Sequence, residues 1–358
     1  MAKSYFRPAI DRLAGYTPGE QPKMQDLIKL NTNENPYPPA PGVAQVLREL
    51  DIDKLRRYPD PCADGLRDMI AERFGFTRNN VIAVNGSDDL LTIVFRAFCD
   101  REHPLATLAP TYSLYEVLAS MQEAPVQKIV LDAANDFAMP SAETVLAGAK
   151  GASLLIITRP NAPTGNSCEL ETLRKIAAGF EGILLVDEAY ADFASDNAIP
   201  LVKEFDNCIV SRTFSKSYSL AAGRIGYAIA SEEIIYGLMK LKDSYNVDMI
   251  TQLVARAAFA DTEYLAENVR KIIEGRERLY AALQELGCRV IKSNANFLFA
   301  SPPDGNGEKW FRELRDRAII VRYFPGELTG AWCRITIGKN EEIDKVILAS
   351  KEIFSNFT

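Results

Sequence analysis

The chain has 358 residues, of which 47% are hydrophobic and 25% are charged, a composition typical of globular proteins with one large core or two unequal ones. Its formal net charge of −7 and the absence of Lys and Arg clusters argue against a nucleic-acid partner. With no apolar run of membrane-spanning length, no signal-peptide pattern and six scattered cysteines, we expect a cytoplasmic protein with reduced thiols and no membrane contact.

Residues 1–45 predict an extended N-terminal arm. They include the Pro- and Asn-rich run LNTNENPYPPAPG, which has few signals for helix or strand. We expect an arm with so little local structure to pack against another domain or subunit and to contribute to a small domain.

Residues 46–245 predict a large domain in which strands and helices alternate. Short apolar runs predict strands, and runs with apolar residues at helical spacing predict helices. The predicted strands are 81–84, 105–109, 126–131, 153–158, 182–188, 208–214 and 224–230, and the predicted helices between them are 88–100, 111–121 and 169–180. This alternation favours an α/β fold with a mostly parallel sheet covered by helices on both faces.

The pattern changes after residue 230. Residues 232–242 and about 248–286 predict helices, and we assign 246–285 to long linking helices. Residues 286–358 predict a small α+β C-terminal domain, with strands in CRVIKS, NFLFA, AIIVR and CRITIG and helices in KWFRELRDR and EEIDKVILASKEIF.

The single histidine restricts the chemistry. His103 precedes a proline in CDREHPLA and is expected in a surface loop. One histidine cannot form a His-based triad or a multi-His metal site within one chain, so we expect no metal centre. Acid–base chemistry must then come from Lys, Tyr, Cys or carboxylate side chains.

The turn NGSDD, at residues 85–89, joins a predicted strand to a predicted helix. Backbone N–H groups of Gly86, Ser87 and Asp88 at such a helix start can bind a phosphate. Capping of the helix by the Ser87 or Asp88 side chain explains the same residues, and taken alone the turn favours capping.

Two ionisable residues lie where other predicted strands end. Asp187 ends the strand of LLVDEAY, where a carboxylate can either pair with a protonated ring nitrogen or cap a loop. Lys216, in SRTFSKSYSLAAGRIGY, lies among Ser, Thr and Tyr, and Arg224 follows eight residues later. Neighbouring cations and burial can make a lysine nucleophilic, although an ordinary ion-paired lysine is the simpler reading of this segment alone. Ser215 and Arg224 can complete a phosphate site.

A fourth segment, RPNAPTGN at 159–166, also follows a predicted strand. The four segments therefore offer a phosphate site, a partner for a ring nitrogen, an amine and a polar turn in one alternating domain. The sequence contains neither a P-loop nor the pattern G-x-G-x-x-G, so no competing nucleotide site is indicated.

The order P-N-x-P-T-G, D-E-A-Y, S-K and an Arg eight residues later resembles the fold-type I aminotransferases that use pyridoxal 5'-phosphate (PLP). Further segments resemble the histidinol-phosphate aminotransferase family: LNTNENPYPP (30–39), RYPDP (57–61), NGSDDLL (85–91), RAFCD (96–100), PTYSLY (110–115) and CRITIG (333–338). The resemblance extends from about residue 8 to the C-terminus. Its superfamily motifs are more specific than its subfamily motifs.

The resemblance implies that Lys216 forms the Schiff base with PLP and then acts as the base for the 1,3-proton shift. It implies that Asp187 keeps the pyridine nitrogen protonated and that Tyr190 hydrogen-bonds the phenolic oxygen of the ring. Tyr112 would stack on the ring, although a helical aromatic is more often a core residue. The cofactor phosphate would be held by Gly86, Ser87, Asp88, Ser215 and Arg224.

The resemblance also implies partners for the site. Tyr58 would reach the phosphate from a neighbouring subunit, which implies a homodimer with shared active sites. Tyr16, Asn33, Arg322 and Arg334 would face the substrate. Both arginines lie on predicted strands of the small domain, where they can form an anion site, unless one of them makes a structural ion pair.

One position departs from the family. An Asn that hydrogen-bonds the phenolic oxygen usually precedes the Pro of P-T-G, whereas this chain has Ala162 there and Asn161 one residue earlier. Either Asn161 takes over the contact through a shifted backbone, or Tyr190 makes it alone.

The function that the resemblance implies is amino transfer between L-histidinol phosphate and 2-oxoglutarate in histidine biosynthesis. Aromatic-amino-acid aminotransferases and threonine-phosphate decarboxylases share the scaffold and remain alternatives, because a few side chains decide substrate choice. A non-catalytic aminotransferase-like protein is a further alternative, but such proteins normally lack the lysine or carry a DNA-binding domain.

Overall fold

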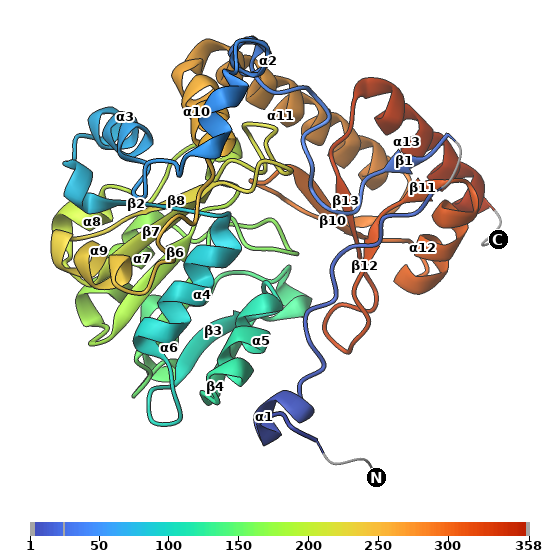
Figure 1. Ribbon diagram of the computed structural model, residues 1–358. Coiled ribbons are helices and arrows are strands. Elements are labelled where there is room, and N and C mark those ends of the chain that lie inside the picture. Colours follow the sequence, from blue (N-terminus) through green and yellow to red (C-terminus); the bar gives the residue numbers. More distant parts are fainter. Residues whose placement is uncertain (1–3, 24–25, 356–358) are drawn as a thin grey trace.

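The computed structural model describes residues 4–23 and 26–355, so the outer ends of the predicted arm and C-terminal domain, and residues 24–25, lie outside the described residues. The chain forms a large seven-stranded sheet covered by helices and a smaller four-stranded sheet with its own helices (Figure 1). No helix in the described ranges is long and apolar enough to cross a membrane.

The large sheet has the strand order β2-β8-β7-β6-β5-β3-β4. Its strands are β2 (Val81–Val84), β3 (Leu105–Ala109), β4 (Val126–Val130), β5 (Leu154–Thr158), β6 (Ile183–Asp187), β7 (Cys208–Thr213) and β8 (Gly226–Ile229). Strand β8 pairs antiparallel with β2 and β7, and the remaining neighbours pair in parallel. The predicted mostly parallel sheet is confirmed.

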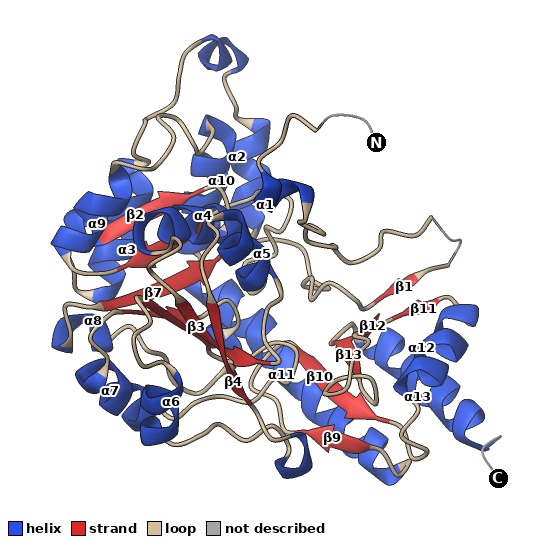
Figure 2. Ribbon diagram, turned by 90° about the horizontal axis from the view of Figure 1, so that it is seen from below, coloured by secondary structure: helices blue, strands red, loops and turns tan. Residues whose placement is uncertain are grey.

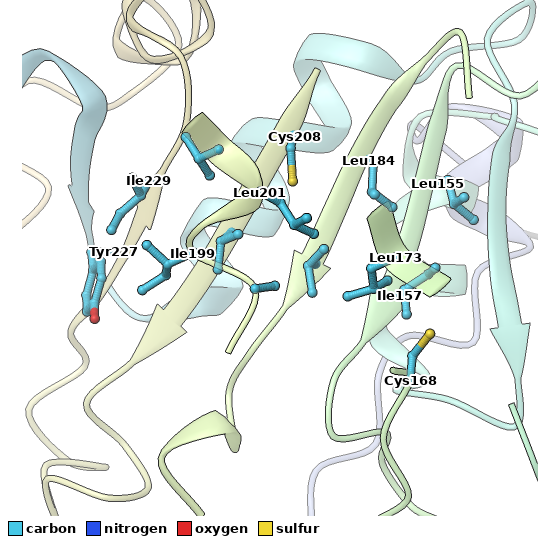
Figure 3. Close-up of a cluster of buried hydrophobic side chains, with 14 of the residues drawn as sticks. Leu155, Ile157, Cys168, Leu173, Leu184, Ile199, Leu201, Cys208, Tyr227 and Ile229 are labelled. Atoms are coloured by element: carbon cyan, nitrogen blue, oxygen red, sulfur yellow. The ribbon is translucent and has the colours of Figure 1, made fainter. Parts of the chain in front are cut away.

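Helices cover both faces of this sheet because strand side chains alternate between the faces. Leu154 and Ile156 of β5 share a core with α4 (Ser87–Phe98), α5 (Leu114–Met121) and α9 (Glu232–Met239). Leu155 and Ile157 share the opposite core, part of which Figure 3 shows. The helices of that core are α2 (Pro41–Arg48), α3 (Asp64–Phe74), α6 (Ala142–Gly148), α7 (Leu170–Gly179), α8 (Leu201–Glu204) and α10 (Met249–Ala260). Each fully buried Leu or Ile stabilises the fold by about 1.5–3 kcal/mol.

The smaller sheet is antiparallel, in the order β12 (Arg322–Tyr323), β13 (Cys333–Thr336), β10 (Phe297–Ser301) and β9 (Arg289–Ile291). It packs with α11 (Thr262–Glu285), α12 (Gly307–Asp316) and α13 (Asn340–Ser355) (Figure 2). The buried ring of Trp310 belongs to the core that these elements share. The 24-residue helix α11 leads into this part of the chain from the large sheet.

The arm touches both parts of the molecule. Its helix α1 (Pro8–Asp11) lies near α5, its strand β1 (Ile28–Lys29) pairs in parallel with β11 (Ile319–Ile320), and α2 packs on α10. The single strand expected in AIIVR is therefore wrong. Ile319 and Ile320 pair with the arm, whereas Arg322 beyond Val321 pairs with Arg334 of β13.

Candidate active site

A cavity of about 530 Å³ lies at the carboxyl end of the parallel strands. Such strand ends meet at one edge of a sheet, where α/β proteins bind ligands. The large sheet contributes the ends of β5, β6 and β7, and the small sheet contributes two arginines. The arm contributes Tyr16, Pro18, Gly19, Gln21 and residues 31–34. The predicted residues that line the cavity are Tyr16, Asn33, Ser87, Asp88, Tyr112, Asp187, Tyr190, Ser215, Lys216, Arg224, Arg322 and Arg334.

Lys216 extends its amine into this cavity from the turn after β7. Its Nζ donates a hydrogen bond of 3.0 Å to the carbonyl oxygen of Thr32 in the arm. Burial, and next the positive charge of Arg334, lower the pKa of Lys216 to about 8. A substantial fraction of this amine is therefore neutral and nucleophilic near neutral pH, unlike a solvated lysine.

Asp187 is a buried carboxylate with neutral hydrogen-bond donors. Tyr115 donates from its hydroxyl at 2.6 Å, Ser211 from its hydroxyl at 3.1 Å, and Ala189 from its backbone N–H at 3.3 Å. Burial raises the pKa of Asp187, and these three hydrogen bonds oppose that rise. Among the described residues no cation forms an ion pair with Asp187, so the carboxylate suits a positively charged ring nitrogen from a ligand.

An anion site lies at the start of α4. Gly86 precedes the helix with φ +81°, and no side chain caps the helix, so the capping alternative does not hold. A Cβ at Gly86 would lie 2.6 Å from Nη2 of Arg224, so glycine lets the guanidinium approach the turn. Arg224 also donates to Ser215 Oγ at 3.4 Å and to Asp88 Oδ2 at 3.2 Å. The backbone amides at the start of α4, the Ser215 hydroxyl and the Arg224 guanidinium thus converge, and together they provide the hydrogen-bond donors that a phosphate group binds.

Three tyrosines surround the centre of the cavity. The Tyr190 hydroxyl accepts a hydrogen bond of 3.0 Å from Nδ2 of Asn33, and burial raises the pKa of Tyr190. Tyr112 donates to Asp88 Oδ1 at 3.3 Å, and its ring meets that of Tyr16 edge-on with 5.7 Å between centroids. These rings can bound a planar aromatic ligand between the lysine and the arm.

Two arginines form the small-sheet side of the cavity. Arg322 and Arg334 lie opposite each other in the β12–β13 pair. Arg334 donates through Nη2 to the Asn31 carbonyl at 2.9 Å, whereas its buried Nε has no partner in the described part of the chain. Arg322 donates to the carbonyls of Thr17 and Pro18 in the arm at 3.1 and 3.3 Å. A buried guanidinium N–H without a partner is costly, so the site is suited to an anionic ligand.

Gly86 does not line the cavity itself but adjoins Ser87 and Arg224, which do, and two further predicted residues, Asn161 and Tyr58, do not line it either. The Asn161 amide donates to the Pro110 carbonyl and to the Thr164 hydroxyl and accepts from Thr111, so its hydrogen bonds join its loop to the segment after β3. The neighbouring Ala162 lines the cavity instead. Tyr58 is 80% exposed and stacks on Tyr245 with 4.4 Å between ring centroids, outside the cavity of its own chain.

Sequence reasoning missed residues that serve the site indirectly. Tyr115 fixes Asp187, and Thr32 of the arm holds Lys216 through its backbone. Glu34 also lines the cavity and forms an ion pair with Lys29. Tyr115 is the last residue of the segment PTYSLY, but the spacing of apolar residues along a helix does not distinguish a tyrosine of the core from one that contacts a carboxylate.

The architecture and the site together define an aminotransferase, and the sequence model of the aminotransferase class I and II family matches residues 25–349. Histidinol-phosphate aminotransferases of Chromohalobacter salexigens and Citrifermentans bemidjiense are 41% and 42% identical, over 98% and 97% of this chain and 99% and 98% of theirs. The chain therefore belongs to the histidinol-phosphate aminotransferase family, within class I and II.

The structure of histidinol-phosphate aminotransferase from Sinorhizobium meliloti in complex with PLP has the same fold. It aligns with a TM-score of 0.91 at 24% identity, covering 100% of this chain and 99% of that one. At 19% identity, L-threonine-O-3-phosphate decarboxylase from Porphyromonas gingivalis shares the fold with a TM-score of 0.79. Fold alone therefore does not separate the aminotransferase from the decarboxylase.

Proposed function

We propose that this chain transfers the amino group between L-histidinol phosphate and 2-oxoglutarate, in histidine biosynthesis, with PLP as cofactor. The observation that carries the proposal is the guanidinium of Arg334, which lines the same cavity as Lys216 and whose buried Nε has no hydrogen-bond partner in the described part of the chain. A cationic site beside a nucleophilic amine suits a substrate that carries both an amino group and an anionic group.

The residues of the cavity fit PLP. Bound PLP supplies an aromatic ring that accepts electrons from the substrate carbon. We assign Lys216 to hold the cofactor covalently and to carry a proton on its Nζ from the substrate carbon that bears the amino group to the cofactor carbon that receives the nitrogen. Asp187 keeps the ring nitrogen protonated, and Tyr190 donates to the phenolic oxygen. The amides of residues 86–88 bind the phosphate together with Ser215 and Arg224.

The substrate is held by its anionic groups. Arg334, next to Arg322 on the paired strands, can take the phosphate of histidinol phosphate in one half-reaction and a carboxylate of glutamate in the other. Both groups accept the two parallel hydrogen bonds that a guanidinium donates. Tyr16 and Asn33 lie on the arm side of the cavity and complete the substrate's surroundings.

The choice of substrate is the first test of the proposal. We expect a kcat/KM for histidinol phosphate about 100-fold or more above that for phenylalanine or tyrosine, because a polar site left unpaired by the substrate is penalised strongly. Steady-state kinetics with these donors and with threonine phosphate measures the preference. Preference for an unphosphorylated aromatic amino acid would favour the aromatic aminotransferase alternative, and release of carbon dioxide from threonine phosphate would favour the decarboxylase.

Arg334→Ala is expected to slow both half-reactions, because histidinol phosphate and glutamate lose the same anion partner. A charge-assisted hydrogen bond contributes about 1.5–3 kcal/mol, so we expect roughly a 10- to 100-fold fall in kcat/KM for each substrate. Single-turnover absorbance changes of the cofactor follow each half-reaction separately. Arg289→Ala is the matched control, since this exposed arginine of β9 pairs with Asp136 on the surface. An effect on only one half-reaction would contradict a shared anion site.

Ala162→Asn tests the loop beside the cofactor ring. The Asn161 amide already donates to the Pro110 carbonyl and to the Thr164 hydroxyl, so we propose that Tyr190 alone contacts the phenolic oxygen in this chain. A new amide donor at position 162 would stabilise the ionised oxygen and lower the pH midpoint of the cofactor's visible absorbance band. Asn161→Ala should leave that midpoint in place. An unchanged midpoint in Ala162→Asn would mean that the loop does not approach the ring.

Lys216 argues against the alternative that this chain is a non-catalytic aminotransferase-like protein, since its amine is retained in the cavity with a lowered pKa.

We further propose a homodimer with shared active sites, in which the exposed Tyr58 reaches the cofactor phosphate of the neighbouring subunit. Sedimentation equilibrium tests this, and a monomer at working concentration would exclude it. The free cysteines are consistent with a cytoplasmic location, which we also propose.

We propose that the division into an arm (1–45), a large PLP-binding domain (46–245), linking helices (246–285) and a small domain (286–358) is the functional one. The cavity then lies between the large and small domains, with the arm as its third side. Limited proteolysis is expected to cut first near these boundaries, and early cuts within the large sheet would contradict the division.

A further inference from the structure

A network of charged side chains, buried at its centre and partly exposed at its two ends, lies next to the active site without lining the cavity. Glu188, whose side chain is fully buried, accepts from Nε of Arg212 at 2.9 Å on one oxygen and from Nη1 of Arg159 at 3.3 Å on the other. Arg212 continues to Asp192 at 2.8 Å, and Arg159 continues to Asp196 at 2.6 Å. Buried charges persist only where partners compensate them, so the network holds these side chains in fixed positions.

This network is connected to Asp187 through the neighbouring strands β6 and β7. The Ser211 hydroxyl donates to Asp187 at 3.1 Å, and the residues that directly follow these two, Arg212 and Glu188, form the ion pair. Successive side chains in extended backbone point to opposite faces, so the ion pair lies behind the Asp187–Ser211 hydrogen bond. The backbone N–H of Glu188 also donates to the Ser211 carbonyl at 3.0 Å. The network therefore fixes the strand ends that place Asp187.

A second connection reaches the lysine. The other carboxylate oxygen of Asp192 accepts a hydrogen bond from the hydroxyl of Ser217, which directly follows Lys216 in the chain. Asn35 fixes the same turn from the arm, because its amide donates to the carbonyls of Lys216 and Ser217 at 3.2 and 3.1 Å. Asp192 thus touches both Arg212, behind the sheet edge, and the residue next to the catalytic amine.

We infer that Asp192 is a positioning residue: through Ser217 and Arg212 it holds the turn of Lys216 in register with Asp187. The inference rests on the proposed function, in which these two residues act on the same cofactor. A misplacement of about 1 Å can cost about 100-fold in rate when reacting groups are pre-aligned. Neither Asp192 nor Ser217 lines the cavity, so substrate binding does not depend on them directly.

The test compares the PLP-loaded wild type with Asp192→Ala and Ser217→Ala. We expect each variant to lower kcat by about 10-fold or more with KM unchanged within about 2-fold, since alignment is lost while the substrate contacts remain. Visible circular dichroism per bound cofactor should fall as well, because it reports how the ring is held. The double variant should lose no more than the worse single variant, since both remove one shared hydrogen bond.

Asp196→Ala is the matched control. Its carboxylate pairs with Arg159 at the other end of the network, is 48% exposed, and forms no ion pair or hydrogen bond with the Lys216 turn among the described residues. We expect its kcat and visible circular dichroism to match the wild type. If Asp192→Ala does not fold, Ser217→Ala decides, because it leaves every ion pair intact.

Normal kcat in Ser217→Ala, an equal loss in Asp196→Ala, or additive losses in the double variant would each overturn the inference. Failure of the proposed function gives a different result. The wild type itself would then fail to transfer the amino group of histidinol phosphate to 2-oxoglutarate, whatever the variants do.

Discussion

Lys216→Ala will abolish measurable transamination. Proton transfer by a positioned side chain contributes about 10²- to 10⁴-fold to rate, and this variant also loses the covalent hold on the cofactor. The amine has no substitute in the cavity, since Lys216 is the only lysine among its described lining residues. Turnover with histidinol phosphate and 2-oxoglutarate measures the effect. Lys128→Ala removes a surface lysine paired with Glu116 and should retain full activity.

The lowered pKa gives this prediction a pH dependence. Only the neutral amine attacks a carbonyl, and the pKa of Lys216 is lowered to about 8 by burial and by Arg334. Covalent capture of PLP by the apoenzyme should therefore accelerate as pH rises through about 8 and then level off. Borohydride reduction and peptide mass mapping should place a pyridoxyl group on Lys216. An adduct on another lysine would refute its role.

Much of the fold followed from the sequence because its strands are short, apolar and well separated. The runs at 81–84 and 105–109 became β2 and β3 with the predicted bounds. AIIVR was misread, because apolar periodicity cannot reveal that its first half pairs with the arm and its last residue with β13. Helix α3 was not predicted, since charged residues are interspersed among its apolar ones and one of them, Arg67, is buried with the apolar side chains.

The candidate site was predictable where a strand end places a side chain. Asp187 and Lys216 follow strands of one sheet, so their convergence follows from topology. The orientation of Asn161 was not predictable, because two of its three hydrogen-bond partners, Pro110 and Thr111, are 51 and 50 residues away in the chain. The Glu188–Arg212 pair also escaped notice, since charged residues next to a strand normally face water rather than one another.

Asp187→Ala is expected to lower kcat by about 100-fold or more with the cofactor still bound. A hydrogen bond to a charged group contributes about 1.5–3 kcal/mol, and each 1.4 kcal/mol changes a rate about tenfold. The loss reaches beyond that bond, because a ring nitrogen without its carboxylate loses its proton and the ring accepts electrons poorly. Stopped-flow absorbance of the first half-reaction with histidinol phosphate measures the chemical step apart from product release.

Two further variants separate charge from packing. Asp187→Asn keeps the size of the side chain but not its charge, so it should be nearly as slow as Asp187→Ala. Ser211→Ala removes one of the three hydrogen bonds that Asp187 accepts and keeps the carboxylate, so it should lose less than about 10-fold. If Asp187→Asn turned over at the wild-type rate with PLP bound, the carboxylate would not be the partner of the ring nitrogen. A loss in Ser211→Ala as large as in Asp187→Asn would instead assign the effect to the geometry of the strand end.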